Sequence, residues 1–95
     1  MTPEGRVKHE IKEWLKKRKG QIWFFMPVQN GMGVMGIPDI IICWNGQFVA
    51  VECKAPGKRS TVTPLQQRNL DTISECGGRA IVVTSLEEFL QLAPL

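Results

Sequence analysis

The order of apolar patterns along the 95-residue chain predicts an α/β fold, a mixed four-stranded sheet flanked by helices. Three observations predict it. An amphipathic helix comes first, an Asn-Gly turn joins two apolar runs, and a capped helix separates the third strand from the fourth. That last helix makes a connection of the right length for two parallel strands. The expected order is therefore αβββαβ, followed by a short final helix.

The first helix is expected over roughly Pro3 to Lys19. Thr2 suits the N-cap, and proline suits the first helical position. The apolar positions recur at helical spacing and are Val7, Ile11, Trp14 and Leu15. Glu4 lies near the centre of this apolar stripe, so its carboxylate is expected to face the sheet. Glu10 lies farther from the centre of the stripe, and His9 and Glu13 are expected to face solvent.

An Asn45-Gly46 turn is the strongest local signal in the chain, because both central residues of a type I′ turn need positive φ. It joins an expected strand at Ile40–Trp44 to another at Gln47–Lys54. Counting outward from the turn places Asp39 directly opposite Glu52. Like charges that face each other across two strands are destabilising, so another group must offset their repulsion.

Side chains alternate along a strand, which puts Lys54 on the same face as Glu52 and close to Asp39. Two carboxylates suit a hard divalent cation such as Mg²⁺ or Mn²⁺, and an ammonium group suits a phosphate. This pattern indicates a metal-dependent phosphodiesterase centre. A cross-strand charge cluster at a solvated sheet edge is the alternative interpretation, and the hairpin by itself leaves both open.

The remaining elements flank this hairpin. Gln21–Val28 is aromatic and β-branched enough for a first strand. Thr63-Pro64-Leu65-Gln66 is an N-cap, a first-turn proline and a capping-box glutamine, which predicts a helix to about Cys76 with Gln66 facing inward. Arg79–Thr84 is expected to be a strand buried on both faces. Ser85-Leu86-Glu87-Glu88 predicts another capping box and a last helix ending near Leu92.

Gly31, Gly33 and Gly36 have the Gly-x-Gly-x-x-Gly spacing of a dinucleotide site. Such a site must open a helix, but Pro38 and a strand follow here, so a dinucleotide fold is excluded. We expect a flexible loop where missing side chains let a DNA backbone approach. This makes Gly33 and Gly36 candidate DNA contacts.

Composition limits the function further. A chain of 95 residues with 43% apolar residues supports one modest core, so residues 1–95 are expected to form a single domain. Its three cysteines indicate neither a disulfide framework nor a zinc site. With no signal peptide or membrane-length apolar run, the expected location is the cytoplasm.

The net charge of +3 is compatible with nucleic acid without requiring it. Basic residues gather in two places, and these supply the candidate contacts with DNA phosphates: Lys16, Lys17, Lys19, Lys58 and Arg59. Solvated surface faces are the alternative explanation for such runs.

In chain order, Gly36-Ile37-Pro38-Asp39, Glu52-Cys53-Lys54 and Thr63-Pro64-Leu65-Gln66 resemble the VRR-NUC (virus-type replication-repair nuclease) branch of the PD-(D/E)XK nuclease superfamily. The resemblance extends from about Glu4 to Val83. It implies a restriction-endonuclease-like core and a metal-dependent endonuclease that hydrolyses phosphodiester bonds in DNA.

The resemblance also implies roles for individual residues. Asp39 and Glu52 would bind Mg²⁺ or Mn²⁺, together with the backbone carbonyl of Cys53. Lys54 would orient the attacking water and offset charge in the transition state, and Gln66 matches the family's glutamine. The family's early helical glutamate matches Glu4 better than Glu10, which makes Glu4 a further catalytic residue and metal ligand.

So short a chain resembles the stand-alone phage or bacterial members, which are similar to Holliday junction resolvases of DNA repair. A homodimer is expected, because two symmetric cuts need two sites related by a two-fold axis. Three alternatives stay open. The chain could be a nickase or a flap or end-processing nuclease, a non-catalytic DNA-binding module, or a small structural protein with a charge cluster.

Overall fold

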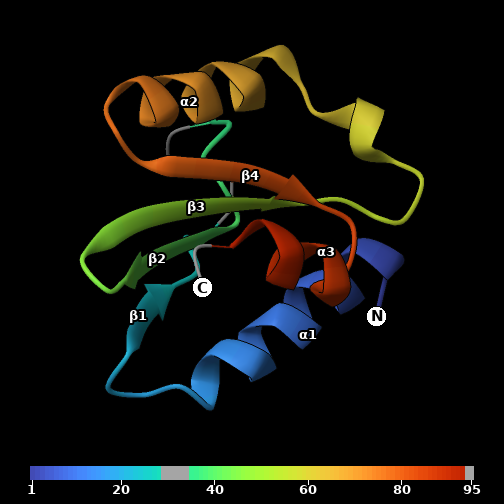
Figure 1. Ribbon diagram of the computed structural model, residues 1–95. Helices are drawn as coiled ribbons and strands as arrows, with labels where there is room; N and C mark the ends of the chain where they lie inside the picture. Colours follow the sequence, from blue (N-terminus) through green and yellow to red (C-terminus); the bar gives the residue numbers. More distant parts are fainter. Residues whose placement is uncertain (29–34, 94–95) are drawn as a thin grey trace.

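The computed structural model describes residues 1–28 and 35–93 of the chain. Four strands form one sheet, three α-helices pack on it, and a short 3₁₀ turn at Arg59–Thr61 follows the third strand (Figure 1). The elements, in chain order, are α1 (Pro3–Lys16), β1 (Ile22–Phe25), β2 (Ile40–Trp44), β3 (Gln47–Cys53), α2 (Pro64–Glu75), β4 (Arg79–Val83) and α3 (Leu86–Leu92).

The strands lie in the order β1-β2-β3-β4, so each strand pairs with its neighbour in sequence. The first two pairings are antiparallel, and β3 pairs with β4 in parallel through the α2 crossover. Helices α1 and α3 cover one face of the sheet and α2 covers the other (Figure 1). The predicted αβββαβ(α) order and the mixed, helix-flanked sheet are both confirmed.

The β2–β3 hairpin has the register that its turn predicts. Asn45 and Gly46 adopt φ angles of 51° and 81°, the positive values that a type I′ turn requires. Ile40 pairs with Val51, and Trp44 pairs with Gln47 next to the turn. This register fixes which residues of the two strands share a face.

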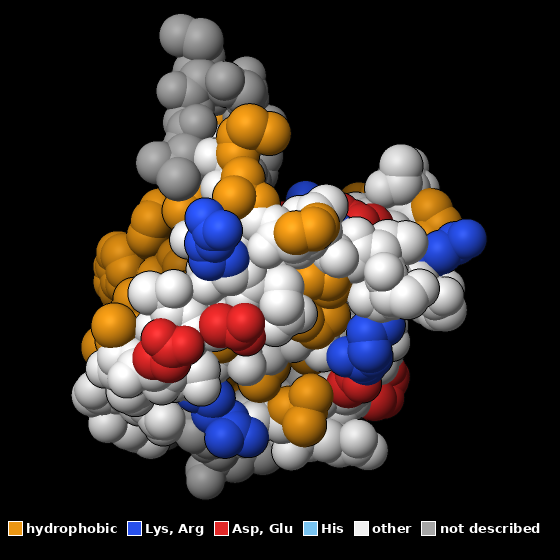
Figure 2. Space-filling view, turned by 90° about the horizontal axis from the view of Figure 1, so that it is seen from above, with side chains coloured by type: hydrophobic (Ala, Val, Ile, Leu, Met, Phe, Trp, Pro, Cys, Tyr) orange, Lys and Arg blue, Asp and Glu red, His pale blue; other side chains and the backbone are white. Residues whose placement is uncertain are grey.

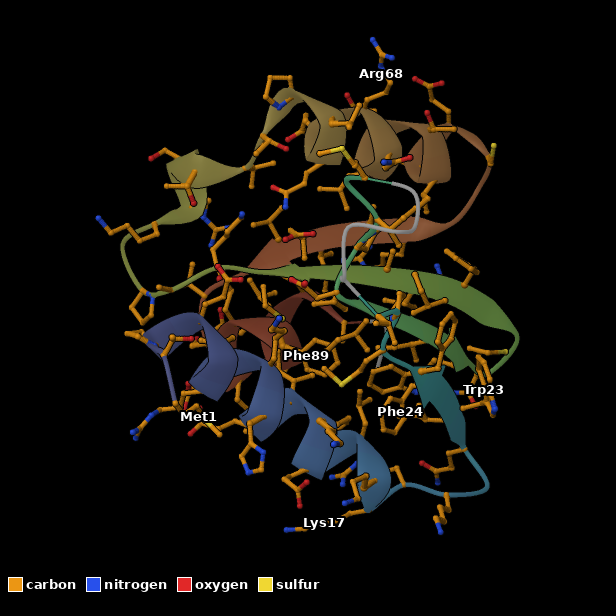
Figure 3. All side chains as sticks on the ribbon, turned by 180° about the vertical axis from the view of Figure 1, so that it is seen from behind. Met1, Lys17, Trp23, Phe24, Arg68 and Phe89 are labelled. Atoms are coloured by element: carbon orange, nitrogen blue, oxygen red, sulfur yellow. The ribbon has the colours of Figure 1, made fainter. Side chains whose placement is uncertain are left out.

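The hydrophobic core lies between the sheet and the α1–α3 layer. Trp14 of α1 packs against Trp44 of β2 with ring centroids 5.6 Å apart, and Phe89 of α3 contacts Trp14 at 5.8 Å. Phe24 and Phe89 both point into the space between α1 and the sheet (Figure 3). This packing fixes α1 on the sheet and thereby positions the residues of its first two turns.

The opposite face of the sheet is less completely covered. Helix α2 contributes Leu70 as its buried residue. Trp23 and Phe25 of β1 remain 61% and 46% exposed, and Trp23 lies at the edge of the sheet (Figure 3). Strand β4 was predicted to be buried on both faces, but Ala80 and Val82 are only half-buried because α2 shields this face incompletely.

Helix α1 ends at Lys16, three residues before the predicted end. The amides of Lys17 and Arg18 donate to carbonyls only three residues back, at 3.3 and 3.0 Å, and this tighter turn stops the helix. β1 is likewise confined to Ile22–Phe25 and does not fill the predicted range. With these bounds, no helix in the described ranges is both long enough and apolar enough to cross a membrane.

Helix α3 begins as predicted, but its capping differs. Ser85 Oγ accepts from the amide of Glu88 at 3.0 Å. The Glu88 carboxylate does not complete a capping box with Ser85; instead its Oε1 accepts from the amide of Thr84 at 2.7 Å. Its other oxygen pairs with Arg59, so the helix start is joined to the segment that follows β3.

Candidate functional site

Asp39 follows the buried Pro38 and directly precedes β2, and it is only 8% exposed. Its Oδ2 accepts a hydrogen bond from the backbone amide of Cys53 at 2.8 Å. The hairpin therefore holds this carboxylate against the end of β3. The sequence predicts Asp39 opposite Glu52; in the structure Asp39 lies at that end of β3, and its hydrogen bond is to the next residue, Cys53.

Glu52 on β3 is 2% exposed. Its Oε2 accepts from the side-chain amide of Gln66 at 3.2 Å and lies 3.9 Å from the ammonium of Lys54. Its Oε1 is buried and, within the described part of the chain, has no hydrogen-bond partner. A buried carboxylate oxygen without a donor is costly, so this atom indicates a place where a further positive group can bind.

The environment of Glu52 strongly favours its protonated form in the absence of a cation. Burial raises its pKa from 4.5 to about 8, the nearby Asp39 carboxylate adds to the rise, and Lys54 opposes it. Burial, followed by the charge of Asp39, also raises the pKa of the Cys53 thiol well above its usual range. Two acids so close together and so poorly hydrated need a positive charge to be ionised together.

Lys54 extends the site beyond the end of β3. It is 7% exposed, and its backbone amide donates to the carbonyl of Val83 at 2.9 Å, which ties the ends of β3 and β4 together. Its ammonium lies beside Glu52, as the alternation of side chains predicts. The lysine is consequently held in place by the sheet.

Gln66 comes from the first turn of α2. Thr63 caps this helix, and the Gln66 side chain completes the predicted capping box by accepting from the amide of Thr63 at 2.9 Å. The same side chain donates to Glu52. The start of α2 is therefore part of the site.

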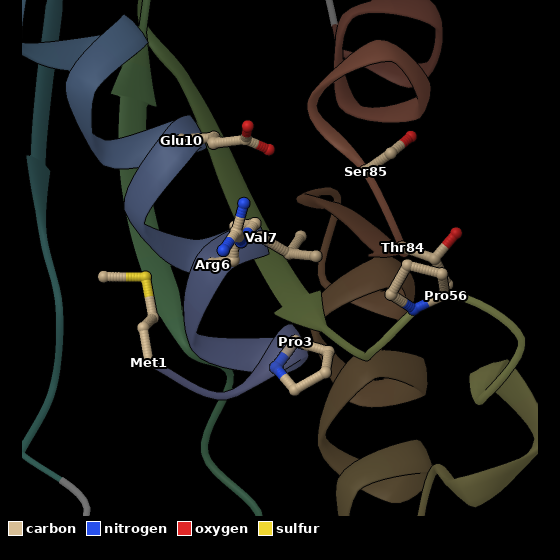
Figure 4. A pocket seen from close by; sticks show the side chains of 8 residues that line it. All are labelled: Met1, Pro3, Arg6, Val7, Glu10, Pro56, Thr84 and Ser85. Carbon is tan, nitrogen blue, oxygen red and sulfur yellow. The ribbon is translucent and has the colours of Figure 1, made fainter.

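The structure brings Glu4, and not Glu10, toward the acid pair. Glu4 is half-buried, and its charge contributes to the raised pKa of Glu52. Glu10 is exposed and lines a separate hollow of about 370 Å³, together with Arg6 and the segment around Pro56 (Figure 4). The inward position predicted for Glu4 agrees with this geometry.

Lys8, which was not predicted to lie there, also reaches the site. Its Nζ lies 3.7 Å from Oδ1 of Asp39, and its side chain is 30% exposed. Residues four apart lie on the same side of a helix. The spacing of Lys8 from the inward Glu4 was therefore the sequence signal that could have placed Lys8 at the site.

The two acids fit a hard divalent cation, which prefers carboxylate, carbonyl and water oxygens. Within residues 1–28 and 35–93 there is no group of three or more His, Cys, Asp or Glu side chains that could hold a metal ion. The side chains of Asp39 and Glu52 would thus need backbone carbonyl or water ligands to complete a coordination sphere. The partnerless Oε1 of Glu52 supports this fit.

The predicted DNA contacts fall into two groups. Lys58 and Arg59 follow β3 at the site end of the molecule, but the Arg59 guanidinium already pairs with Glu88 and donates to the carbonyl of Val82 at 2.7 Å. Lys16 and Lys17 lie at the other end of α1, about 18 Å along the helix from Glu4. Figure 3 shows Lys17 at the opposite end of this helix from Met1.

The shortened α1 also places Lys19 in the loop before β1, where it is exposed. Lys16 pairs with Glu13 at 3.4 Å. Seen from above α2, basic and acidic side chains are interspersed on the surface (Figure 2). Because Lys16, Lys17 and Lys19 lie at or beyond the far end of α1, they can contact DNA only at a distance from the acid pair.

Gly36 has a structural role in the described fold. It adopts φ = 79°, and a Cβ there would lie 2.9 Å from the backbone carbonyl of Leu65 and 3.0 Å from Asn69 Nδ2. Asn69 also donates to the Gly36 carbonyl at 3.0 Å. The close approach of α2 therefore explains why this position lacks a side chain, and the DNA contact expected at Gly36 stays a prediction. Gly33 lies outside the described residues.

Comparison with known proteins places this site in a family. The sequence profile of the VRR-NUC domain matches residues 4–87, which include every residue of the acid cluster. The chain belongs to the VRR-NUC family. VRR-NUC domains are nucleases of the PD-(D/E)XK type, a group that acts on DNA and generally uses divalent metals.

A solved structure described as a VRR_NUC domain has a similar fold. It is 24% identical in sequence, the match covers 97% of this chain and 95% of that one, and the TM-score is 0.75. No curated protein matches the chain. The structural likeness supports the VRR-NUC fold.

Proposed function

We propose that this VRR-NUC chain is a Mg²⁺- or Mn²⁺-dependent endodeoxyribonuclease that hydrolyses phosphodiester bonds in branched DNA, with four-way junctions as its preferred substrate. The buried Asp39–Glu52 pair, with its partnerless Oε1, carries the proposal. Apolar residues would fill these buried positions at a lower cost in stability, so packing alone does not explain the two acids.

Asp39, Glu52 and the backbone carbonyl of Cys53 would hold the cation. Glu4 does not form a three-acid metal site with them in the described residues, and it would become a further ligand only once the cation is bound. A divalent cation bound there would lower the pKa of a water molecule and neutralise charge on the scissile phosphate. The Cys53 amide fixes one oxygen of Asp39 at 2.8 Å, and Gln66 fixes one oxygen of Glu52 at 3.2 Å. Both acids are thereby oriented before a cation arrives.

Lys54 would act on the reacting groups. Its ammonium is nearly buried and lies on the Glu52 side of the pair, where it can orient the attacking water. When the water oxygen bonds to phosphorus and the P–O ester bond breaks, negative charge grows on the phosphate oxygens. A fixed positive charge in a poorly hydrated site stabilises that charge.

We propose further that residues 1–95 form one nuclease domain, that the active form is a homodimer, and that it works in the cytoplasm. A two-fold axis would present two acid pairs to the two strands that must be cut symmetrically. Lys58, Arg59 and the basic residues at the far end of α1 would contact DNA phosphates on either side of the cut.

The test is cleavage of a panel of labelled four-way junction, flap, nicked and linear DNA in Mg²⁺, Mn²⁺ or EDTA. Paired symmetric cuts in the junction, lost in EDTA, are the expected result. Cuts in one strand, or at flaps and ends, would replace the junction specificity with that of a nickase or an end-processing nuclease. DNA binding without any cleavage would overturn the proposed activity.

Substitutions test the role proposed for each residue in cleavage. Asp39→Asn and Lys54→Met should each reduce the cleavage rate by more than about 100-fold at saturating cation, since each removes a charge that acts on the transition state. Glu4→Gln should slow cleavage, whereas the matched Glu10→Gln on the same helix should not. Full activity of Asp39→Asn would contradict this assignment.

A further inference from the structure

The two oxygens of Asp39 have different partners. Oδ2 accepts from the backbone amide of Cys53 at 2.8 Å, a contact that cannot move without distorting the hairpin. Oδ1 lies 3.7 Å from Nζ of Lys8, which comes from a different layer of the fold. Oδ1 is thus the oxygen that the hairpin leaves available to another cation, and an ammonium group now lies beside it.

The two lysines of the site differ in how firmly they are held. The side chain of Lys54 is 9% exposed, and the backbone of this residue is hydrogen-bonded to Val83 at the end of β4. The side chain of Lys8 is 30% exposed and lies at the solvated edge of the site. Its four-carbon stem can carry the ammonium group away from Asp39 without disturbing α1.

The charges of the cluster explain why such a movement is favourable. Glu4, Asp39 and Glu52 supply three negative charges when ionised, while Lys8 and Lys54 supply two positive ones. With a divalent cation bound, these five ionised groups and the ion carry a net charge of +1. An ammonium group next to Oδ1 is then repelled, and a phosphodiester with one negative charge becomes the matching partner.

We propose that Lys8 is an exchangeable counter-ion: it pairs with Asp39 in the absence of a divalent cation and moves to a non-bridging phosphate oxygen of the DNA once a cation is bound. This role rests on the proposed nuclease function, since it addresses the same phosphate. It makes Lys8 a substrate-binding residue, in addition to Lys54, that engages DNA only in the cation-loaded state.

A purely structural ion pair gives a different expectation. If Lys8 only stabilised Asp39 in the folded protein, its neutralisation would lower the melting temperature equally with and without a divalent cation. The exchange role predicts that the loss of stability occurs in EDTA and disappears at saturating Mn²⁺, because the bound cation takes over the contact with Asp39.

The decisive measurement is Mn²⁺ affinity in the absence of DNA, by calorimetry and by the rise in melting temperature. Lys8→Met should bind Mn²⁺ about 3-fold to 10-fold more tightly than the parent, since the ion no longer displaces an ammonium group. Lys12→Met, one turn further along α1 and exposed, should bind Mn²⁺ like the parent. Unchanged or weaker binding by Lys8→Met would overturn the exchange.

The second measurement is cleavage of a four-way junction at saturating Mn²⁺. Lys8→Met should lower kcat/KM by about 10-fold and reduce the slope of log affinity against log salt by about one, the loss of one phosphate contact. Lys8→Arg retains the charge and should keep the parent's Mn²⁺ affinity. A Lys8→Arg protein that bound Mn²⁺ as tightly as Lys8→Met would show that charge is not the cause.

The two proposals fail in distinguishable ways. If the parent cleaves no DNA in Mg²⁺ or Mn²⁺, the nuclease function fails, but the comparison of Mn²⁺ affinities still tests the exchange at Asp39. If the parent cleaves DNA and Lys8→Met cleaves it equally well at saturating cation, the role of Lys8 in phosphate binding is wrong while the nuclease function stands.

Discussion

Gln66 connects the start of α2 to Glu52 on β3. Its Oε1 accepts from the amide of Thr63 at 2.9 Å, and its Nε2 donates to Oε2 of Glu52 at 3.2 Å. One side chain thus completes the helix cap and orients a buried acid. The position of the helix and the position of the acid are coupled, so a change at Gln66 acts on both.

Gln66→Ala should lower both stability and activity. The variant loses half of the capping box and the hydrogen bond to a buried carboxylate, and we expect a loss of about 1–3 kcal/mol in urea unfolding. Cleavage should fall as well, because Glu52 is no longer oriented. Thr63→Ala is the matched control: it should lose about 1 kcal/mol by uncapping α2 while retaining most of the cleavage rate. Equal losses of activity in the two variants would contradict the orienting role.

The raised pKa of Glu52 predicts an unusual pH profile of stability. Between pH 4.5 and about 8, folded Glu52 holds a proton that the unfolded chain has released. Proton binding favours the folded state there, so in EDTA stability should decrease as the pH rises through this window and level off above pH 8. The decrease, measured by urea unfolding, should be on the order of a few kcal/mol.

Two variants test whether Glu52 causes this pH dependence of stability. Glu52→Gln has no proton to lose at this position and should show a flatter profile from pH 5 to 9. Glu75→Gln, which removes an exposed carboxylate from α2, should follow the parent. Parallel profiles for the parent and Glu52→Gln would mean that Glu52 is ionised in the folded protein at neutral pH. Saturating Mn²⁺ should flatten the profile of the parent.

Gly36→Ala should be strongly destabilising. The φ of 79° disfavours any L side chain, and the new Cβ would lie 2.9 Å from the backbone of Leu65. We expect a loss of about 2–5 kcal/mol in urea unfolding. Gly57 has the same φ of 79° with open space around it, so Gly57→Ala should lose only about 1 kcal/mol. A similar loss for both variants would rule out the steric contact with α2.

Arg59 and Lys58 are neighbours with different expected roles. Arg59→Ala breaks the ion pair with Glu88 and the hydrogen bond to Val82, so the melting temperature should fall. Burial tends to raise the pKa of Glu88, but the Thr84 amide and the Arg59 charge together lower it, consistent with an ionised partner. Lys58→Ala should leave the melting temperature unchanged and weaken DNA binding in low salt. A stable Arg59→Ala protein would contradict the structural role.

Part of the site could be predicted from local patterns. The Asn45-Gly46 turn fixes a register, the register sets Asp39 against the Glu52-Cys53 segment, and the capping-box pattern places Gln66 in the first turn of α2. Each of these depends on interactions between residues near in sequence or joined by a two-residue turn, whose geometry has few alternatives.

Other contacts depend on how separate elements pack. The approach of Lys8 to Asp39, the pairing of Arg59 with Glu88, and the closeness of Gly36 to Leu65 each join segments that no local pattern relates. The early end of α1 and the unexpected partner of Glu88 also depend on particular hydrogen bonds. Each of these bonds competes with other hydrogen bonds of similar energy, and the local sequence does not select among them.

The sequence by itself determined the order of the elements, the hairpin register and the identity of the two acids, because backbone geometry and side-chain alternation leave little choice at short range. Only the tertiary structure decided the environment of the two acids. Burial raises the pKa of Glu52, α1 brings Lys8 to Asp39, and α2 brings Gln66 to Glu52. The physical reason is that desolvation and charge pairing depend on what packs around a group, which the position of that group in the chain does not specify.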